Sequence, residues 1–273
     1  MQNQHAADDG EQQVQDVFLT LWGDNGGECS PFALLPALYY ASEYAKGNRR
    51  LPDIKKSFRE KYGISFDTFM QLDLPGGGLA PDYKLDPDFI ADIEKYMLYN
   101  DPFMGIFDST VQPGGAESFR ELSKKLSKAV NDPEWGYLFD SERALCDVLA
   151  IKYDLGVRTR EAYQKHDTNA LISLLPEYSL LSERLEIFYR KYGEAWKREK
   201  KPQGFDVQEI RLGGLMLRVR SCCERLKAYT EGTLNIIEEL EEPALDLYGG
   251  GTELKKEPCC SNHWASTVTC NSL

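Results

Sequence analysis

Trp22, Asp24 and Glu28 lie close together in the stretch "VFLTLWGDNGGECSPFALLPALYY", residues 17–40. An indole ring offers a flat apolar face on which the C–H groups of a pyranose can stack. A carboxylate two residues away can accept hydrogen bonds from a pair of sugar hydroxyls. The spacing therefore predicts a carbohydrate-binding surface formed by Trp22 and Asp24, with Glu28 either touching the sugar or supporting the loop.

The flanking residues predict how these side chains are positioned. Residues 17–21 are an apolar run rich in β-branched and aromatic types, which predicts a short buried strand. Ser30 and Pro31 suit the N-cap and first position of a helix that ends at Gly47, and Pro36 predicts a kink or a tight first turn. Strand, glycine-rich loop and helix make one β/α unit, and β/α barrels carry their active sites at the C-terminal ends of strands.

Simpler structural interpretations of the same residues stay open. Trp22 could belong to the core, Asp24 could cap a turn, and Glu28 could favour the N-terminus of the following helix. Elsewhere, Arg158 and Arg160 in the stretch "GVRTRE" predict ion pairs with acidic side chains inside a helical bundle.

The seven cysteines indicate free thiols rather than a disulfide framework. Their number is odd and includes two adjacent pairs, which is typical of a reducing compartment, so we expect a cytoplasmic protein. No CxxC spacing occurs, and we expect neither a metal site nor a cofactor. Cys259, Cys260 and His263 could form a nucleophilic pair, but no third group orients a base there. A tail that docks through Trp264 is the favoured interpretation.

Composition excludes several classes of partner. The chain has 273 residues, of which 42% are hydrophobic, so a substantial core can form. A net charge of −12 argues against nucleic acid, since phosphate binding needs a basic surface. No run of about 18 apolar residues occurs, so we expect no membrane association. The opening "MQNQHAADDGEQQ" lacks the basic and apolar regions of a secretory signal.

Beyond residue 48 the sequence predicts a helical domain. Apolar residues at helical spacing recur in three long segments, within residues 137–165, 168–200 and 205–232, and each stripe needs a partner helix to bury it. In the third segment the predicted stripe consists of Ile210, Leu215, Leu217, Leu226 and Tyr229.

The stretch "VFLTLWGDNGGECSPFALLPALYYASEYAKGN" resembles the last strand and helix of the catalytic barrel in family 20 glycoside hydrolases. The bacterial β-N-acetylglucosaminidase branch has an extra C-terminal helical domain, which four later stretches resemble in order: "ALCDVLAIKYDLGVRTREAYQ", "GFDVQEIRLGGLMLRVRSCCERL", "LEEPALDLYGGG" and "CCSNHWASTVTCNSL". The resemblance implies a mainly α fold. The last β/α unit of a TIM barrel would occupy residues 1–48, an α-helical domain residues 49–247, and an extended tail residues 248–273.

The resemblance also implies roles for two residues. Trp22 would line the floor of the pocket for a terminal N-acetylhexosamine, and Asp24 would bind its O4 and O6 hydroxyls. In this family the acetamido oxygen of the substrate attacks the anomeric carbon, while an Asp orients the acetamido group and the neighbouring Glu acts as general acid. This chain has no Asp-Glu dipeptide and only one β/α unit. We therefore expect no catalytic residue here, and an inactive C-terminal part of an exo-β-N-acetylhexosaminidase that acts on N-acetylhexosaminide glycans.

Two other functions fit the same residues. A non-catalytic helical module could dimerise, or could support a barrel supplied by another chain, because the catalytic pair is missing and helices make up most of the length. In this interpretation the chain could form a homodimer through its helical domain. A scaffold unrelated to sugars is the third alternative, and it predicts that Trp22→Ala has no consequence.

Overall fold

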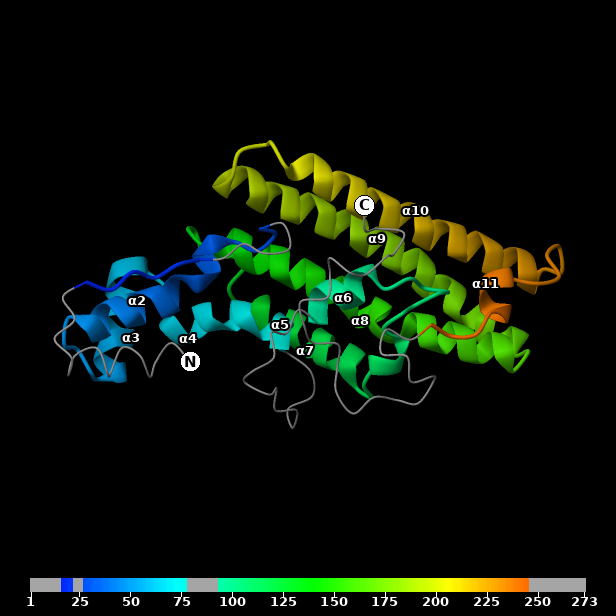
Figure 1. The fold of residues 1–273 in the computed structure, drawn as a ribbon, viewed down its shortest axis with the longest axis horizontal. Coiled ribbons are helices and arrows are strands. Elements are labelled where there is room, and N and C mark those ends of the chain that lie inside the picture. The colour runs from blue at the N-terminus through cyan, green and yellow to red at the C-terminus, as the bar shows by residue number, and fades with distance from the viewer. Residues whose placement is uncertain (1–15, 22–26, 78–92, 246–273) are drawn as a thin grey trace.

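The computed structural model describes residues 16–21, 27–77 and 93–245, and all regular secondary structure within these ranges is helical (Figure 1). Three long helices form the body: α8 (Gly136–Gln164), α9 (Thr168–Glu199) and α10 (Phe205–Thr230). The shorter helices are η2 (Pro31–Leu34), α2 (Leu35–Ala45), α3 (Leu51–Tyr62), α4 (Phe66–Phe69), η3 (Met70–Asp73), α5 (Leu74–Gly77), α6 (Ile93–Tyr99), η4 (Asp108–Thr110), α7 (Gly115–Leu126) and α11 (Glu238–Glu241). The prediction of a mainly α fold is confirmed.

The long helices pack along one another, with α9 in contact with both α8 and α10, and α7 in contact with α8 (Figure 1). Helices α2 to α4 lie at one end of this body and α11 at the other. Most of the predicted apolar stripes are buried, as in Leu149 of α8, Leu181 of α9 and Leu215 of α10. Ile210 and Leu217 differ, because they are 56% and 64% exposed on α10. Assigning them to the buried stripe was wrong.

Residues 17–21, predicted to be a buried strand, are neither buried nor in a strand. Phe18 is 90% exposed, and Val17, Leu19 and Leu21 also belong to the exposed apolar side chains. A strand needs a neighbouring strand to pair its backbone groups, and the described residues contain none. The apolar pattern indicated a preference for burial, but the described part of the chain contains no sheet against which these side chains could pack.

The helix that follows residue 30 begins as predicted. The Ser30 hydroxyl accepts a hydrogen bond from the backbone N–H of Phe32 at 3.1 Å, which satisfies one of the unpaired donors at the helix start. Pro31 opens the single turn η2, and Pro36 lies in the first turn of α2, where its missing N–H has no cost. The tight first turn predicted from Pro36 is confirmed.

An aromatic cluster joins α2 and α3 to the residues before α8. The ring of Tyr39 on α2 lies 5.4 Å from Phe58 and 5.6 Å from Tyr62, both on α3, in edge-on contacts. Trp135 donates its indole N–H to the carbonyl oxygen of Tyr62 at 3.1 Å, and its ring lies 5.2 Å from Phe69. Such ring pairs contribute about 0.5–1.5 kcal/mol each beyond the area they bury. Helix α2 is therefore packed onto the helical body.

Two residues in the middle of α8 explain how the turn after α6 packs against this helix. Lys152 is 6% exposed, and its ammonium donates to the carbonyl oxygens of Met97, at 3.0 Å, and Asn100. Gly156 permits close approach of the chain, since a Cβ there would lie 3.0 Å from the carbonyl oxygen of Pro102. A buried lysine and a glycine inside one helix thus both serve the same contact.

The two arginines predicted to form ion pairs behave differently. Arg158 forms a bidentate pair with Glu177, at 2.8 and 2.7 Å, which confirms that prediction. Arg160 instead donates to backbone carbonyl oxygens, including that of Phe103 at 2.6 Å. The ion-pair prediction was wrong for Arg160, because its guanidinium group donates to backbone carbonyl oxygens and not to a carboxylate.

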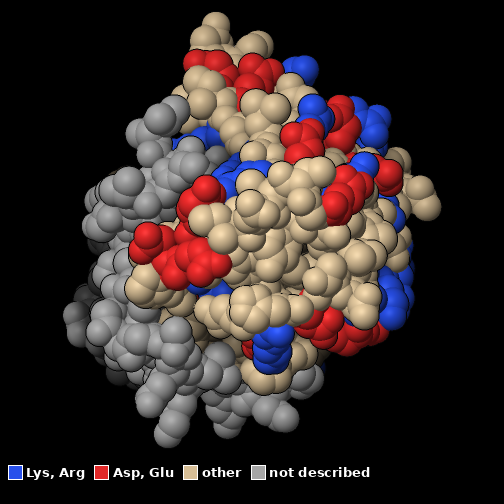
Figure 2. All heavy atoms as spheres, turned by 90° about the vertical axis from the view of Figure 1, so that its right-hand side faces the viewer, with Lys and Arg blue, Asp and Glu red and all other residues tan. Residues whose placement is uncertain are grey.

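The described surface mixes charges of both signs. Viewed from the end at which α11 lies, acidic and basic side chains are interspersed rather than gathered by sign (Figure 2). Several are neighbours on one helix, such as Lys165 with Glu161 and Lys227 with Glu231. No helix in the described ranges has both the length and the apolar character needed to cross a bilayer.

Candidate functional site

Residues 27–30, which follow the loop that carries the predicted sugar-binding residues, are fixed to the helical body through their backbone. The Lys200 ammonium donates to the carbonyl oxygens on either side of Glu28, at 2.6 and 3.1 Å. The Tyr192 hydroxyl donates to the carbonyl oxygen of Glu28 at 3.2 Å. The Ser30 hydroxyl donates to a carboxylate of α9 at 2.8 Å. The end of α9 therefore holds residues 27–30 in place.

The Glu28 carboxylate is held from both sides. One oxygen accepts a hydrogen bond from Arg211 of α10 and the other from Lys95 of α6, each at 2.7 Å. The side chains of Glu28, Arg211 and Lys95 are only 18%, 15% and 11% exposed, so solvent screens these pairs weakly. Both carboxylate oxygens are thus engaged by the helical body, which supports the loop-supporting interpretation of Glu28.

A pocket of about 150 Å³ lies beside Glu28, where α6, α8, α9 and α10 come together. Its walls are mostly apolar and include Leu98, Leu138, Leu145, Phe188 and Leu212. The polar side chains that line the same space include Ser141 and Glu142 of α8 and Gln208 of α10. Apolar walls with a few convergent polar groups are typical of sites for small molecules.

Burial shifts the ionisation of groups around this pocket. It raises the pKa of Glu142 to about 7, and no described charge offsets the effect. Burial also lowers the pKa of Lys200, against the opposing charges of nearby acids. The pKa of Tyr192 is raised, first by burial and then by the charge of Glu28, so its hydroxyl stays protonated and can donate. Burial and added negative charge here make uncharged acids more favourable.

Of the three predicted sugar-binding residues, only Glu28 lies within the described ranges. Trp22 and Asp24 lie outside the described residues, and so does the Cys259–Trp264 stretch. Their roles stay predictions. Within the described ranges, no three His, Cys, Asp or Glu side chains are grouped to hold a metal ion, and Cys146, Cys222 and Cys223 are free thiols.

Sequence reasoning missed the residues that hold the loop end. Lys95 had a signal, because it stands in the run "IEKYMLY", in which five apolar side chains of α6 are buried. A charge inside such a run indicates a buried ion pair. Arg211, Tyr192 and Lys200 had no comparable signal, since their partners in residues 27–29 are remote in the chain and only the fold brings them together.

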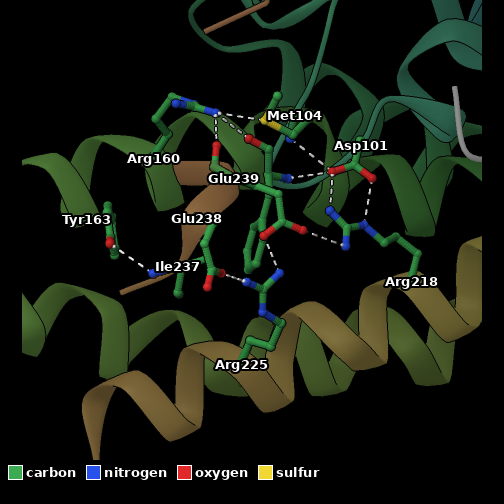
Figure 3. A network of polar contacts seen from close by, with 10 residues as sticks. Asp101, Met104, Arg160, Tyr163, Arg218, Arg225, Ile237, Glu238 and Glu239 are labelled. Carbon is green, nitrogen blue, oxygen red and sulfur yellow. Dashed lines mark hydrogen bonds and ion pairs between the residues drawn. The ribbon is translucent and has the colours of Figure 1, made fainter. Parts of the chain in front are cut away.

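A second polar cluster lies at the α11 end of the body (Figure 3). Arg218 donates two hydrogen bonds to Asp101, at 2.7 and 3.0 Å, and a third to Glu239 at 3.2 Å. Arg225 contacts Glu239 as well, and donates to Glu238 at 2.7 Å. Burial alone would raise the pKa of Asp101, but Arg218 and two backbone N–H groups lower it to about 2. This network, the Arg218 network below, connects α10, α11 and the turn after α6.

Comparison of the sequence with known protein families identifies the family of the helical body. A family profile described as Glycoside Hydrolase 20C C-terminal domain matches residues 67–258, which is well over half of the chain. The chain belongs to this family. The resemblance to the C-terminal helical domain of family 20 glycoside hydrolases is thereby confirmed. A search of curated proteins finds no match to the chain.

The two polar clusters differ in how much of each lies within the matched range. Every member of the Arg218 network lies inside the Glycoside Hydrolase 20C C-terminal domain. At the other end, Lys95, Arg211 and Lys200 lie inside it, whereas Glu28 precedes it. The contacts to residues 27–30 therefore join the family domain to the segment that comes before it.

Proposed function

We propose that this chain is the C-terminal part of an exo-β-N-acetylhexosaminidase, which removes terminal N-acetylglucosamine or N-acetylgalactosamine by substrate-assisted, retaining hydrolysis. Membership of the Glycoside Hydrolase 20C C-terminal domain family supports the enzyme class. The observation that carries the proposal is the fixing of Glu28 by Lys95 and Arg211. It ties the family domain to the end of the loop that contains Trp22 and Asp24.

In this proposal residues 1–48 are the last β/α unit of a TIM barrel. The exposure of the apolar run 17–21, with Phe18 at 90%, supports this, because pairing with a neighbouring barrel strand would bury these side chains. The rest of the barrel would supply the Asp that orients the acetamido group and the Glu that acts as general acid. Without them, the 273-residue chain is inactive by itself.

The helical domain then acts as the support for one wall of the sugar pocket. Trp22 stacks on the terminal sugar, Asp24 binds its hydroxyls, and Glu28 fixes the loop on which both stand. Positioning of this kind matters because a displacement of about 1 Å at a reacting centre can cost about a hundredfold in rate. Ion pairs on both oxygens of Glu28 are well suited to prevent such a displacement.

The test measures hydrolysis of an aryl N-acetyl-β-glucosaminide. The purified chain is assayed alone and after mixing with a separately produced family 20 barrel that carries an Asp-Glu pair and lacks its last β/α unit. We expect no turnover by the chain alone and measurable turnover by the mixture. Trp22→Ala should reduce kcat/KM of the mixture at least tenfold, whereas Trp22→Phe, which keeps a flat aromatic face, should reduce it less.

Two results would contradict the proposal. Turnover by the chain alone that disappears in Trp22→Ala would show that the chain is catalytic by itself. A mixture that is as active with Trp22→Ala as with the unchanged chain would show that the helices support a barrel without contributing to its sugar pocket.

A further inference from the structure

The pocket beside Glu28 contains polar side chains that the proposed function does not use. Gln208 is 3% exposed, and its carboxamide forms no hydrogen bond within the described part of the chain. The same holds there for the Ser141 hydroxyl, which is 5% exposed, and for the Glu142 carboxylate. All three side chains line the pocket, and Glu142 is only partly buried. Their polar groups are therefore available to a molecule bound in the pocket.

The charges around the pocket favour a cation as that partner. The carboxylic acids in the lining are Glu28 from the segment before η2, Glu94 of α6 and Glu142 of α8. Lys95 is the basic side chain in the lining, and its ammonium is bound to Glu28. Among the described residues, no basic side chain forms an ion pair with Glu142.

The size and walls of the pocket limit the ligand to a small, partly apolar molecule. A cavity of about 150 Å³ is large enough for a molecule about the size of benzene. Leu138, Leu145 and Leu212 form apolar walls, and the ring of Phe188 adds an aromatic surface. A bare metal ion would leave these walls uncovered, and a sugar would place many hydroxyl groups against them.

We propose that this pocket binds a small organic amine as its ammonium ion, with Glu142 as the counter-ion. An alkylammonium group has three N–H donors and no acceptor. Glu142, Ser141 and Gln208 each offer an oxygen that can accept one of them. The hydrocarbon part of the amine lies against the leucine side chains, and Phe188 can contribute a cation–π contact.

Calorimetric titration of the 273-residue chain with cyclohexylammonium chloride at pH 8 tests the proposal. Cyclohexanol, which has the same ring and no charge, is the ligand control. We expect saturable one-to-one binding of the amine and at least tenfold weaker binding of the alcohol. Glu142→Gln should weaken amine binding at least tenfold. Glu183→Gln, an exposed change on α9, should not alter it.

Two further readouts keep the test decisive. Burial raises the pKa of Glu142 to about 7, so amine affinity should rise between pH 6 and pH 8, where an alkylammonium stays protonated. This rise should be absent in Glu142→Gln. Gln208→Leu should also weaken binding, because a side chain of similar size then lacks the acceptor oxygen, and circular dichroism checks that each variant is folded. If Gln208→Leu does not fold, Glu142→Gln, which keeps the side-chain shape, decides the outcome.

The proposal is overturned if cyclohexanol binds as tightly as the amine, if Glu142→Gln binds the amine as well as the unchanged chain, or if the folded chain shows no saturable binding at millimolar amine. No sugar and no turnover enter this experiment. Failure of amine binding therefore leaves the proposed hexosaminidase function unaffected. Likewise, failure of the turnover experiment leaves the proposal of an amine-binding pocket unaffected.

Discussion

Two of the arginines on helix α10, Arg211 and Arg218, bind carboxylates with different consequences. Arg218 binds Asp101, and all partners of the Arg218 network lie within the family domain. Arg211 binds Glu28, which lies outside the family domain and continues into the loop with Trp22 and Asp24. The same kind of ion pair thus stabilises the domain at one end and joins the domain to a neighbouring segment at the other.

The acids at the two ends also differ in the direction of their pKa shifts. At the α11 end, burial would raise the pKa of Glu239, but Arg225, a backbone N–H and Arg218 together lower it, and the pKa of Asp101 falls to about 2. In the pocket at the loop end, burial raises the pKa of Glu142 to about 7 without compensation. The first pattern stabilises the fold, whereas the second opposes it and is typical of sites kept for binding.

Arg218→Met should have the largest effect on stability. Asp101 would keep its hydrogen bonds from the N–H groups of Phe103 and Met104 but lose the charge that offsets its burial. We expect a loss of about 3 kcal/mol in the free energy of unfolding at pH 7, measured by urea denaturation. Arg120→Met, which breaks an exposed ion pair, is the control and should cost less than about 0.5 kcal/mol.

The contribution of Arg218 should also depend on pH. The folded pKa of Asp101, about 2, lies below its ordinary value of 3.8. The stabilisation is therefore complete above about pH 4 and is lost as the pH falls toward 2. Equal losses from Arg218→Met at pH 7 and pH 2 would contradict this account.

Glu142→Gln should have an intermediate effect of opposite sign. The folded pKa of Glu142, about 7, lies above its ordinary value of 4.5, so the unchanged chain loses stability as the pH rises from 4.5 through 7. Removing the ionisable group should raise the free energy of unfolding by about 2 kcal/mol at pH 8 and change it little at pH 4. Urea denaturation at both values checks this, and a destabilised variant at pH 8 would show that the carboxylate has a partner.

Arg211→Met should have the smallest effect on global stability and a local effect at the loop end. Lys95 still holds Glu28 in this variant, so the free energy of unfolding should fall by only about 1 kcal/mol. Hydrogen exchange of the backbone amides of residues 27–33 should nevertheless become about tenfold faster, the change that corresponds to ~1.4 kcal/mol of local opening. Arg218→Met, compared at equal global stability, should not accelerate exchange in this segment.

The helices could be predicted because their signals are local. The apolar spacing in α8, α9 and α10 needs only neighbouring residues, and Ser30 and Pro31 mark a helix start by themselves. The apolar residue types at positions 17–21 were not enough to predict a strand, because a strand also needs a neighbouring strand to pair its backbone N–H and C=O groups. The exposed face of α10, with Ile210 and Leu217, was likewise invisible to periodicity, which reports apolar character and not the side that is covered.

The candidate site was predictable only in part. The position of Glu28, two residues before a predicted helix start, made it a candidate from the sequence alone. Its partners Lys95 and Arg211 come from helices that are distant in the sequence. The pocket likewise forms only where four helices meet. Residue type and spacing identify a loop; they do not identify what holds it.

The central claim is that the helical domain positions the sugar-binding loop through Glu28. Its most direct test is kcat/KM of the chain mixed with the barrel, for the Lys95→Met/Arg211→Met double variant against Arg120→Met as control. The account predicts at least a tenfold lower kcat/KM for the double variant, with the two proteins folded and associated to the same extent. Unchanged kcat/KM in the double variant would contradict it.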